Sequence, residues 1–469
     1  MREVPVEPVT LAPYRQVFGA ERTSALFAAA DRVRERLGGR TVWHINSTDA
    51  GGGVAELLSS LVPLARAIGM DTRWLAIDGD AEFFEVAKRL CTRLYGAPGD
   101  AGRLGPAELA RFREVNADNA AGLGDWIAPG DLVIVHDAQP AGLVDAARSL
   151  GATVVWWGHV GRDEPNEHTR DGWAFLRPFV EAADATVFLS AGLVPDWAPH
   201  PMVINPSIDP CAAKNLALDA DQVTTVLGGI GVLDAADGFP VTTKSPLGGP
   251  VRIHRPAAVV RDGPPPAPDV PMVVQVSRWD ELKDMAGVLD AFVATRDPTA
   301  HLTLAGAEVD GVCDDPQATR MFEQCHRRWA ELPADLRRRC QLVCLPMADL
   351  RENAIMVNAL QRHAAVVVQK SLAEGFGLTA TEAMWKSRPV LASAVGGLCD
   401  QVVDGDSGLL IDDPHDIDAT ARALRRLLSD RTFAAKLGGN AHRRVAGNFL
   451  SDRHLLDWAR LFEHATEVA

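Results

Sequence analysis

The sequence predicts an α/β protein built from two doubly wound domains, and three observations support this prediction. At 469 residues, the chain exceeds the size that one hydrophobic core usually organises. In both halves, short continuous apolar runs alternate with helical periodicity, which is typical of parallel strands covered by helices on both faces. Between the halves, residues 220–270 are rich in glycine and proline and show little periodicity.

The first half reads as a series of strand–helix units. Residues 1–20 are predicted to be an extended, proline-marked lead-in, followed by a helix over residues 20–37. A strand is predicted over residues 41–46. It is followed in the sequence by Gly51-Gly52-Gly53 and then by a helix. These glycines either let bare backbone approach a ligand or form a tight turn, and they do not match the dinucleotide-binding GxGxxG spacing. Further strands are predicted at residues 72–77, 131–136, 152–157, 185–189 and 202–204.

Polar residues at the ends of these strands are candidates for a site, because ligands of such sheets bind beyond the carboxyl ends of the strands. His136 and His159 lie at strand ends, whereas His44 lies inside a strand and is predicted to be packed or hydrogen-bonded. Asp78-Gly79-Asp80 matches the short metal-binding pattern DxD, but an aspartate turn after a strand explains it better.

The second half repeats the pattern. Residues 211–268 are predicted to be a connection with an inserted excursion, including a short hairpin around residues 251–253. Residues 416–445 and 451–465 are predicted to be helical, the latter as a final amphipathic helix. The strands of this half are predicted at residues 271–277, 302–305, 341–345, 364–369, 389–393 and 408–411.

Residues 366–385 combine a β-branched strand, a glycine turn and a helix start. A helix that begins at the carboxyl edge of a parallel sheet offers free N–H groups that suit an anion such as a phosphate. Thr379 precedes Glu382 by three residues, which is the capping-box spacing. Arg278 and Lys283 follow the first strand of this half, where they either meet a diphosphate or remain solvated surface charges.

Composition narrows the function classes. A net charge of −15 argues against a generic nucleic-acid binder. The seven cysteines show no CxxC spacing, so structural thiols explain them better than a zinc site. The chain has neither an apolar signal-peptide core nor a run of about 18 apolar residues. We therefore expect a cytoplasmic protein without a membrane or nucleic-acid partner.

The second-half motifs resemble a known family. The run SLAEGFGLTATEAMWKSRPVLASAVGG, with QVSRWDELKD before it, resembles the donor site of retaining GT-B glycosyltransferases of family 4. INSTDAGGGVAELLSSLVPLARAIGMDTRW, HDAQPAGL and NPSIDP are similar to the trehalose synthases that join a nucleotide-activated glucose to glucose. The resemblance covers most of the chain, except about residues 220–268.

The resemblance implies two Rossmann-like domains that face each other across a cleft. Residues 1–210 would form the acceptor-side domain, with the C-terminal helix of residues 448–469 packed back on it. Residues 211–268 would be the linker or insertion, and residues 269–447 the donor-binding domain. It also implies a nucleotide-sugar donor, a small sugar acceptor, no metal or other cofactor, and a homodimer.

The resemblance further implies roles for individual residues. Catalysis would depend on His159, Arg278, Lys283 and Glu374, with His159 near the 6-hydroxyl of the reacting glucose. Glu382 would take the ribose hydroxyls, unless it caps its own helix. The donor would be bound by Gly52, Gly53, Arg278, Lys283, Glu374, Gly375, Phe376, Gly377, Leu378, Thr379 and Glu382. The acceptor contacts would be Asn46, Glu56 and Trp157.

One departure keeps other functions open. The family usually has Arg-Cys before the histidine, where this chain has Trp157-Gly158. From the resemblance, we expect a retaining α-glucosyltransferase that forms α,α-trehalose or a close analogue. The alternatives are a trehalose phosphorylase, a pseudo-glycosyltransferase coupling a nucleotide-activated cyclitol to an amino sugar, and a non-catalytic nucleotide-sugar-binding protein.

Overall fold

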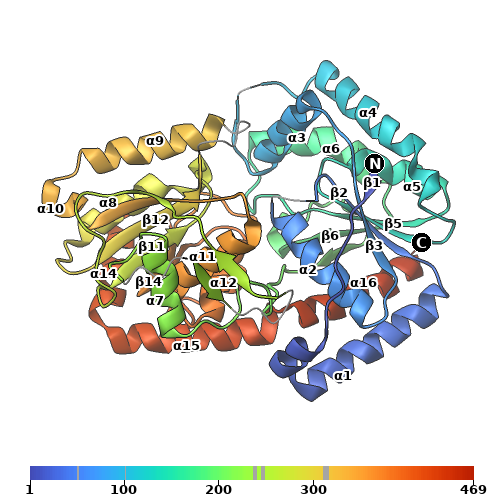
Figure 1. Ribbon diagram of the computed structural model, residues 1–469. Coiled ribbons are helices and arrows are strands. Elements are labelled where there is room, and N and C mark those ends of the chain that lie inside the picture. The colour runs from blue at the N-terminus through green and yellow to red at the C-terminus, as the bar shows by residue number, and fades with distance from the viewer. Residues whose placement is uncertain (50–51, 101, 236–239, 244–248, 310–315, 469) are drawn as a thin grey trace. The chain divides into compact units, whose positions relative to one another are not determined.

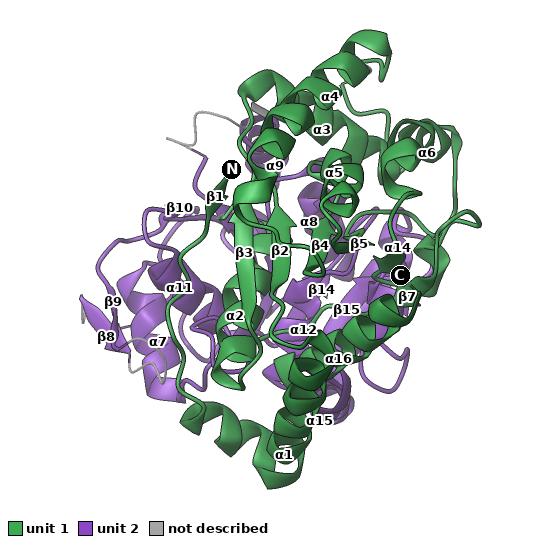
Figure 2. Ribbon diagram, turned by 90° about the vertical axis from the view of Figure 1, so that its right-hand side faces the viewer, with its two compact units in different colours: residues 1–209, 449–469 green, residues 210–448 purple. Residues whose placement is uncertain are grey.

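The computed structural model describes the chain except residues 50–51, 101, 236–239, 244–248, 310–315 and 469. The chain divides into two compact units (Figure 2), each with a seven-stranded sheet. Unit 1 comprises Met1–Asp209 and Phe449–Ala469, and unit 2 comprises Pro210–Asn448. Both sheets are parallel apart from one antiparallel edge strand each. The prediction of two doubly wound α/β domains is confirmed.

Unit 1 has the strand order β1-β3-β2-β4-β5-β6-β7. Its strands are β1 (Arg2–Glu3), β2 (Val42–Asn46), β3 (Thr72–Ala76), β4 (Leu132–His136), β5 (Thr153–Trp157), β6 (Ala185–Phe188) and β7 (Pro201–Val203). Its α-helices are α1 (Ala12–Leu37), α2 (Gly53–Ala67), α3 (Ala81–Leu94), α4 (Pro106–Ala121), α5 (Val144–Ser149), α6 (Glu167–Val180) and α16 (Ser451–Val468). One helical layer contains α3 to α6, and the other contains α1, α2 and α16 (Figure 1). All strands predicted for this half are present.

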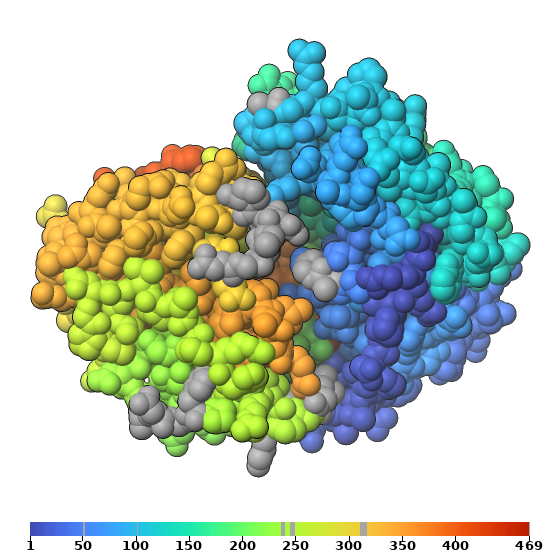
Figure 3. All heavy atoms as spheres, turned by 45° about the horizontal axis from the view of Figure 1, so that its top comes forward, coloured from blue at the N-terminus to red at the C-terminus, as the bar shows by residue number. Residues whose placement is uncertain are grey.

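The extended lead-in was predicted too long. Helix α1 begins at Ala12 and has a kink at Gly19, where φ is 77°. Pro13 lies in the first turn, where its missing N–H costs nothing, and Tyr14 and Phe18 are buried. Only the segment before the helix is extended. Its β1 pairs with β3, and Figure 3 shows this N-terminal segment, in dark blue, at the surface of unit 1.

Unit 2 has the strand order β10-β13-β12-β11-β14-β15-β16, and β8 and β9 form a separate hairpin. Its strands are β8 (Val241–Thr243), β9 (Val251–Ile253), β10 (Ala258–Val260), β11 (Met272–Val276), β12 (His301–Ala307), β13 (Cys340–Leu345), β14 (Val366–Gln369), β15 (Val390–Ser393) and β16 (Leu409–Ile411). Its α-helices are α7 (Ala220–Gly229), α8 (Met285–Thr295), α9 (Pro316–Ala330), α10 (Ala334–Arg337), α11 (Leu350–His363), α12 (Leu378–Trp385), α13 (Leu398–Gln401), α14 (Ile417–Ser429) and α15 (Arg431–Asn448).

Residues 211–268, predicted to be a linker or insertion, lie within unit 2 in the structure. Asp219 and Gln222 form a capping box that starts α7, which packs on α11. The hairpin expected around residues 251–253 is the β8–β9 pair, and β10 adds an antiparallel edge to the main sheet through β13. Apolar burial therefore gives this segment regular structure that its glycine and proline content concealed.

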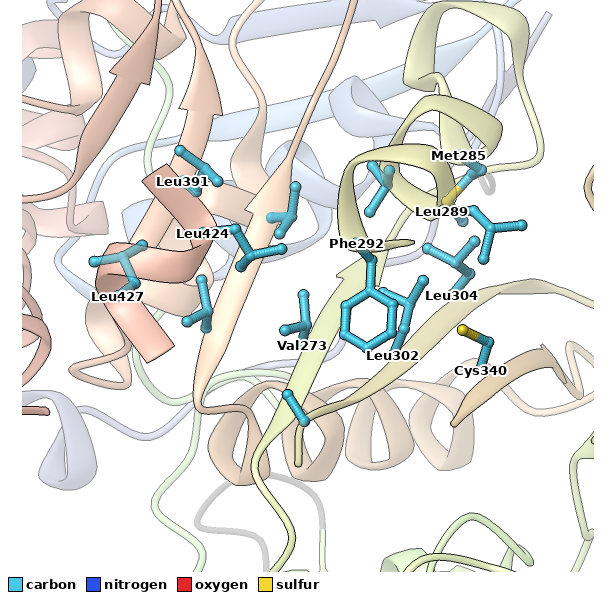
Figure 4. Close-up of a cluster of buried hydrophobic side chains, with 14 of the residues drawn as sticks. Val273, Met285, Leu289, Phe292, Leu302, Leu304, Cys340, Leu391, Leu424 and Leu427 are labelled. Carbon is cyan, nitrogen blue, oxygen red and sulfur yellow. The ribbon is translucent and has the colours of Figure 1, made fainter. Parts of the chain in front are cut away.

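The core of unit 2 lies between the sheet and helices α8 and α14. Figure 4 shows Phe292 and Leu289 of α8 and Leu424 of α14 packed over strand residues such as Leu302. In the same core, β13 buries the thiols of two cysteines, Cys340 and Cys344. This burial agrees with the structural-thiol interpretation.

Helix α16 completes unit 1 although it follows unit 2 in the sequence. It packs on α1, α2 and β5, and it lies alongside α1 in Figures 1 and 2. The buried carboxylate of Asp452 accepts two hydrogen bonds from Arg22 of α1, at 2.5 and 2.6 Å. Among the described residues, no helix is both long and apolar enough to cross a membrane.

Candidate active site

The candidate donor residues lie at the switch point of the unit 2 sheet. Strand β11 has β12 on one side and β14 on the other, so the chain reverses its direction of travel across the sheet between β11 and β14. In doubly wound sheets, ligands bind at such points beyond the carboxyl ends of the strands. The loop after β11 carries Lys283 and the loop after β14 carries Glu374. A backbone hydrogen bond from Leu372 N to Leu282 O, 2.8 Å long, joins the two loops.

Lys283 and Glu374 form an ion pair in which the Lys283 Nζ and the Glu374 Oε2 are 2.5 Å apart. The same oxygen accepts hydrogen bonds from Ser371 Oγ at 3.1 Å and from Gln369 Nε2 at 3.3 Å. The Glu374 side chain is only 9% exposed, so these donors offset the loss of hydration of its charge. Sequence reasoning did not single out Gln369 and Ser371, although both lie within five residues of Glu374.

Arg278 lies apart from this pair. Its side chain is 74% exposed and its NH2 is 2.9 Å from Asp280 Oδ2. Asp280 also accepts from Leu282 N and so caps the short turn that presents Lys283. The structure thus brings Lys283 and Glu374 together. Arg278 lies on the same loop as Lys283, but its long side chain extends into solvent.

Helix α12 begins at Leu378, two residues earlier than the capping-box pattern predicted. Gly377 is the N-cap with φ 87° and ψ 57°, a left-handed conformation that favours glycine. Thr379 is therefore the second residue of the helix, and no side chain caps it. The predicted capping box of Thr379 and Glu382 is wrong. Because the first N–H groups of a helix have no intrahelical acceptor, those of Leu378 and Thr379 suit an anion.

A second glycine pair supports this loop. Gly396 has φ 50°, and a Cβ atom placed on it would lie 1.7 Å from Glu374 O. Gly397 N donates to Gly375 O at 3.0 Å. The turn after β15 therefore fits against the Glu374 loop only because both residues lack side chains. Adjacent glycines after a predicted strand were the available sequence signal.

Glu382 is buried inside unit 2 and lies in a polar cluster. Its Oε1 is 3.5 Å from Lys214 Nζ, and its Oε2 is 3.5 Å from Gln361 Nε2. Gln361 in turn accepts from Lys386 Nζ at 2.7 Å. Burial lowers the pKa of Lys386 to about 7, and Glu382 partly opposes that shift.

Three histidines meet at the switch point of the unit 1 sheet, which falls between β2 and β4. His44 Nδ1 is 2.9 Å from His136 Nε2, and His136 Nδ1 is 2.9 Å from His159 Nε2. His44 lies on β2, His136 ends β4 and His159 follows β5. The buried, hydrogen-bonded position expected for His44 is confirmed.

Burial sets the protonation states around these histidines. Desolvation lowers the pKa of His44 and of His159 to about 3, and lowers that of His136 well below its ordinary value. Burial also raises the pKa of Asp137 to about 7, although its Oδ1 accepts from His159 N at 2.6 Å. All three rings are therefore neutral near pH 7.

Trp157 occupies a different place from the one predicted. Its side chain is 1% exposed, so it lies in the core rather than against an acceptor. Its ring stacks on His159 with centroids 5.6 Å apart and planes 6° apart, and on His454 of α16 at 5.6 Å. The indole ring of Trp157 thus packs against one face of the His159 imidazole.

The remaining unit 1 candidates surround the start of α2. Gly52 is the N-cap with φ 107°, and Gly53 is the first helical residue. Glu56 is exposed in the first turn. Asn46 is buried and donates to Thr48 O at 2.8 Å. Gly51 lies outside the described residues.

The DxD pattern is explained by local structure. Asp80 is the N-cap of α3 and accepts from Phe83 N at 3.0 Å, while Asp78 pairs with the N-terminal ammonium group. Within the described ranges, no three His, Cys, Asp or Glu side chains group together as metal ligands would.

Known proteins resemble the chain along nearly its whole length. The family model "Trehalose synthase, N-terminal domain" matches residues 44–195, and "Glycosyl transferases group 1" matches residues 350–444. Trehalose synthase of Rubrobacter xylanophilus is 34% identical over 458 residues, covering 96% of each chain. That of Thermococcus litoralis is 33% identical over 449 residues, covering 95% of this chain and 94% of the relative.

The chain belongs to the trehalose synthase family of glycosyltransferases. A trehalose phosphorylase of Pleurotus pulmonarius is more distant, with 26% identity over 93% of this chain and 58% of its own length. Among solved structures, α,α-trehalose 6-phosphate synthase from Burkholderia multivorans matches with a TM-score of 0.64 and 17% identity, over 92% of this chain and all of that one. The fold is GT-B, as expected for this glycosyltransferase family.

Proposed function

We propose that the protein transfers glucose from a nucleoside-diphosphate glucose to free glucose, with retention of anomeric configuration, and so forms α,α-trehalose. The Lys283–Glu374 pair beside the open start of α12 is the observation that carries this proposal. The ion pair provides one cation and one carboxylate, and the helix start provides the backbone N–H groups of Leu378 and Thr379. All of them lie at the switch point of a Rossmann-like sheet.

The chemistry follows from where charge develops. As the bond to the diphosphate breaks, negative charge grows on the leaving group, and Lys283, Arg278 and the N–H groups of Leu378 and Thr379 would stabilise it. Lys283 would then exchange its contact with Glu374 for a phosphate oxygen. That exchange would release Glu374 to accept hydrogen bonds from sugar hydroxyls, together with the backbone of Gly375, Phe376 and Gly377.

The remaining roles belong to the same proposal. Glu382 would accept from the ribose hydroxyls, for which it must exchange contacts within its buried cluster. Gly52 and Gly53 would approach the diphosphate, His159 the donor glucose, and Asn46 and Glu56 the acceptor. Trp157 keeps only a supporting role, because its side chain is buried.

The test is incubation of the protein with glucose and, in turn, UDP-, ADP-, GDP- and dTDP-glucose, with products assigned by NMR. We expect α,α-trehalose from at least one donor, and unchanged rates after treatment with EDTA. Folded protein that forms no disaccharide from any donor would contradict the proposal. A rate that EDTA abolishes and Mg²⁺ restores would contradict the metal-free mechanism.

The same assays separate the alternatives. Release of glucose 1-phosphate from trehalose, dependent on inorganic phosphate, would identify a phosphorylase. Turnover only with a nucleotide-activated cyclitol would identify a pseudo-glycosyltransferase. Donor binding without transfer to sugar or water would identify a binding protein.

We further propose a cytoplasmic homodimer. Cys91, Cys325 and Cys340 are free thiols, which suits a reducing compartment. Light scattering of the purified protein tests the dimer, and a monomeric mass at micromolar concentration would contradict it.

A further inference from the structure

The histidine chain of unit 1 consists of His44, His136 and His159, which join β2, β4 and the end of β5. Each contact uses the Nδ1 of one ring and the Nε2 of the next, and both are 2.9 Å long. A neutral imidazole carries one hydrogen, so each contact needs a hydrogen from one ring and a lone pair from the other. Two directions satisfy this rule, and they leave opposite tautomers on His159.

The surroundings of His44 decide between the two directions. His44 Nε2 is buried and has no hydrogen-bond partner among the described residues. The indole of Trp458 stacks on this ring with centroids 4.4 Å apart, and its own Nε1–H is also buried, with no hydrogen-bond partner in the described part of the protein. A hydrogen on His44 Nε2 would therefore add one more buried donor to the indole N–H groups of Trp157 and Trp458, which have no partner among the described residues. Either direction leaves His44 Nε2 unpaired, as a donor or as an acceptor. Because orphaned buried N–H groups are rarer than orphaned buried acceptors, the direction that keeps the hydrogen of His44 on Nδ1 is favoured.

The tautomer of His44 determines the tautomers of the other two histidines. His44 Nδ1–H donates to His136 Nε2, which leaves the hydrogen of His136 on Nδ1. His136 Nδ1–H then donates to His159 Nε2, and the hydrogen of His159 is left on Nδ1. His159 is only half-buried, and its Nδ1 makes no hydrogen bond to the part of the chain that the structure describes.

We propose that His44 and His136 are positioning residues that hold His159 neutral, with its hydrogen on Nδ1, so that it donates a hydrogen bond to a hexose oxygen. The inference rests on the proposed function. It assigns His159 as a hydrogen-bond donor and excludes it as a base at Nδ1. It also assigns a role to two histidines that are buried, His44 and His136.

The groups that face the chain keep it uncharged. From α16, His454 is buried with no partner for either ring nitrogen among the described residues, and its pKa is also lowered by burial. Next to His136, Asp137 has its pKa raised to about 7 by burial. The guanidinium of Arg453 on α16 further disfavours a charged His454. From β5, Trp157 stacks on His159 and fixes the plane of its ring.

The direct test is ¹⁵N NMR of the full chain labelled at histidine, with His159 assigned by its loss in His159→Gln. We expect the His159 spectrum of a neutral ring protonated on Nδ1 at neutral pH. A hydrogen on Nε2, or on both nitrogens, would overturn the proposal. This readout does not need turnover, so it is separate from the proposed function. If the NMR spectrum shows the expected His159 tautomer but the protein has no transferase activity, only the proposed transferase function is refuted.

Matched variants test the positioning role. In His136→Leu, we expect His159 to lose its fixed tautomer and kcat/KM to fall by roughly tenfold or more, towards the ~100-fold loss that removal of a direct donor causes. His454→Leu is the control, because His454 is an equally buried neighbour outside the chain. It should leave the His159 tautomer unchanged. An unchanged tautomer in His136→Leu, or equal loss of the tautomer in His454→Leu, would overturn the proposal.

Discussion

At the scale of single residues, the proposed donor site depends on the ion pair between Lys283 and Glu374. Both side chains are largely buried, whereas Arg278 on the same loop is exposed. In the structure, Lys283 forms an ion pair with the carboxylate that we propose binds the donor sugar. A diphosphate is the kind of ligand that can compete for this lysine, because it offers a larger negative charge.

These differences predict a contrast between two substitutions. Lys283→Met leaves the Glu374 carboxylate buried without its cation, so we expect a loss of about 1–3 kcal/mol of stability. Arg278→Met removes an exposed side chain and should leave the melting temperature unchanged. Both should lower donor affinity. Thermal unfolding and calorimetric titration with the nucleotide of the active donor measure the two effects. An equal loss of stability in both variants would contradict this account.

Asp137 predicts a pH effect at the scale of one side chain. Its pKa is raised by burial from 3.8 to about 7, so the folded protein holds a proton that the unfolded chain releases. This contribution to stability is fully present below about pH 3.8 and is lost as the pH rises through about 7. Asp137 has φ 63°, which asparagine tolerates, and Asn keeps the oxygen that accepts from His159 N.

We therefore expect Asp137→Asn to gain in melting temperature relative to the unsubstituted protein as the pH rises from about 4 to about 8. The buried histidines act in the opposite direction, but they are common to both proteins and cancel in the difference. Thermal unfolding across this range measures it. A difference that does not change with pH would show that Asp137 is ionised in the folded protein.

At the scale of elements, the Glu374 loop after β14 depends on the turn that follows β15. This turn contacts the backbone of Glu374 and Gly375 directly, so its shape sets the position of the carboxylate. Gly405 provides a matched comparison. It also has a positive φ, of 71°, but apart from its chain neighbours no described residue has an atom within 4 Å of a Cβ placed on it.

Alanine at either position should cost about 1–2 kcal/mol, because both backbones are left-handed. Only Gly396→Ala should also displace the Glu374 loop and lower donor affinity and kcat, since its Cβ would overlap Glu374 O. Circular dichroism and steady-state kinetics on both variants test this expectation. Full activity in Gly396→Ala would mean that the loop adjusts without cost.

At the scale of the whole molecule, the chain returns to unit 1 after completing unit 2. Helix α16 buries Leu455, Trp458 and Phe462 and supplies the Asp452 partner of Arg22. Unit 2, by contrast, is formed by the continuous segment 210–448. The two units therefore depend differently on the C-terminus.

Removal of residues 449–469 should expose the apolar face of unit 1 and abolish its cooperative unfolding transition. Residues 210–448 expressed alone should remain folded and bind the donor nucleotide. Calorimetry and nucleotide titration of both fragments test this. A shortened chain that keeps two unfolding transitions would contradict the structural role of α16.

The sequence by itself determined the repeated strand–helix order, the doubly wound class and the loops that hold Lys283 and Glu374. These features are local, because they depend on apolar runs, on periodicity and on glycine turns. The family resemblance added the GT-B fold and the glycosyltransferase activity, which the comparisons confirm. The proposed substrate contacts of individual residues stay predictions.

Only the tertiary structure decided which of these residues meet. It paired Lys283 with Glu374, placed Gly396 against their loop, replaced the expected cap of α12 by Gly377, and buried Trp157 under His159. It also joined His44, His136 and His159 by two hydrogen bonds. These histidines are separated by up to 115 residues in the sequence, but they lie on or just after the neighbouring strands β2, β4 and β5. Such contacts depend on strand order and burial, which no local pattern encodes.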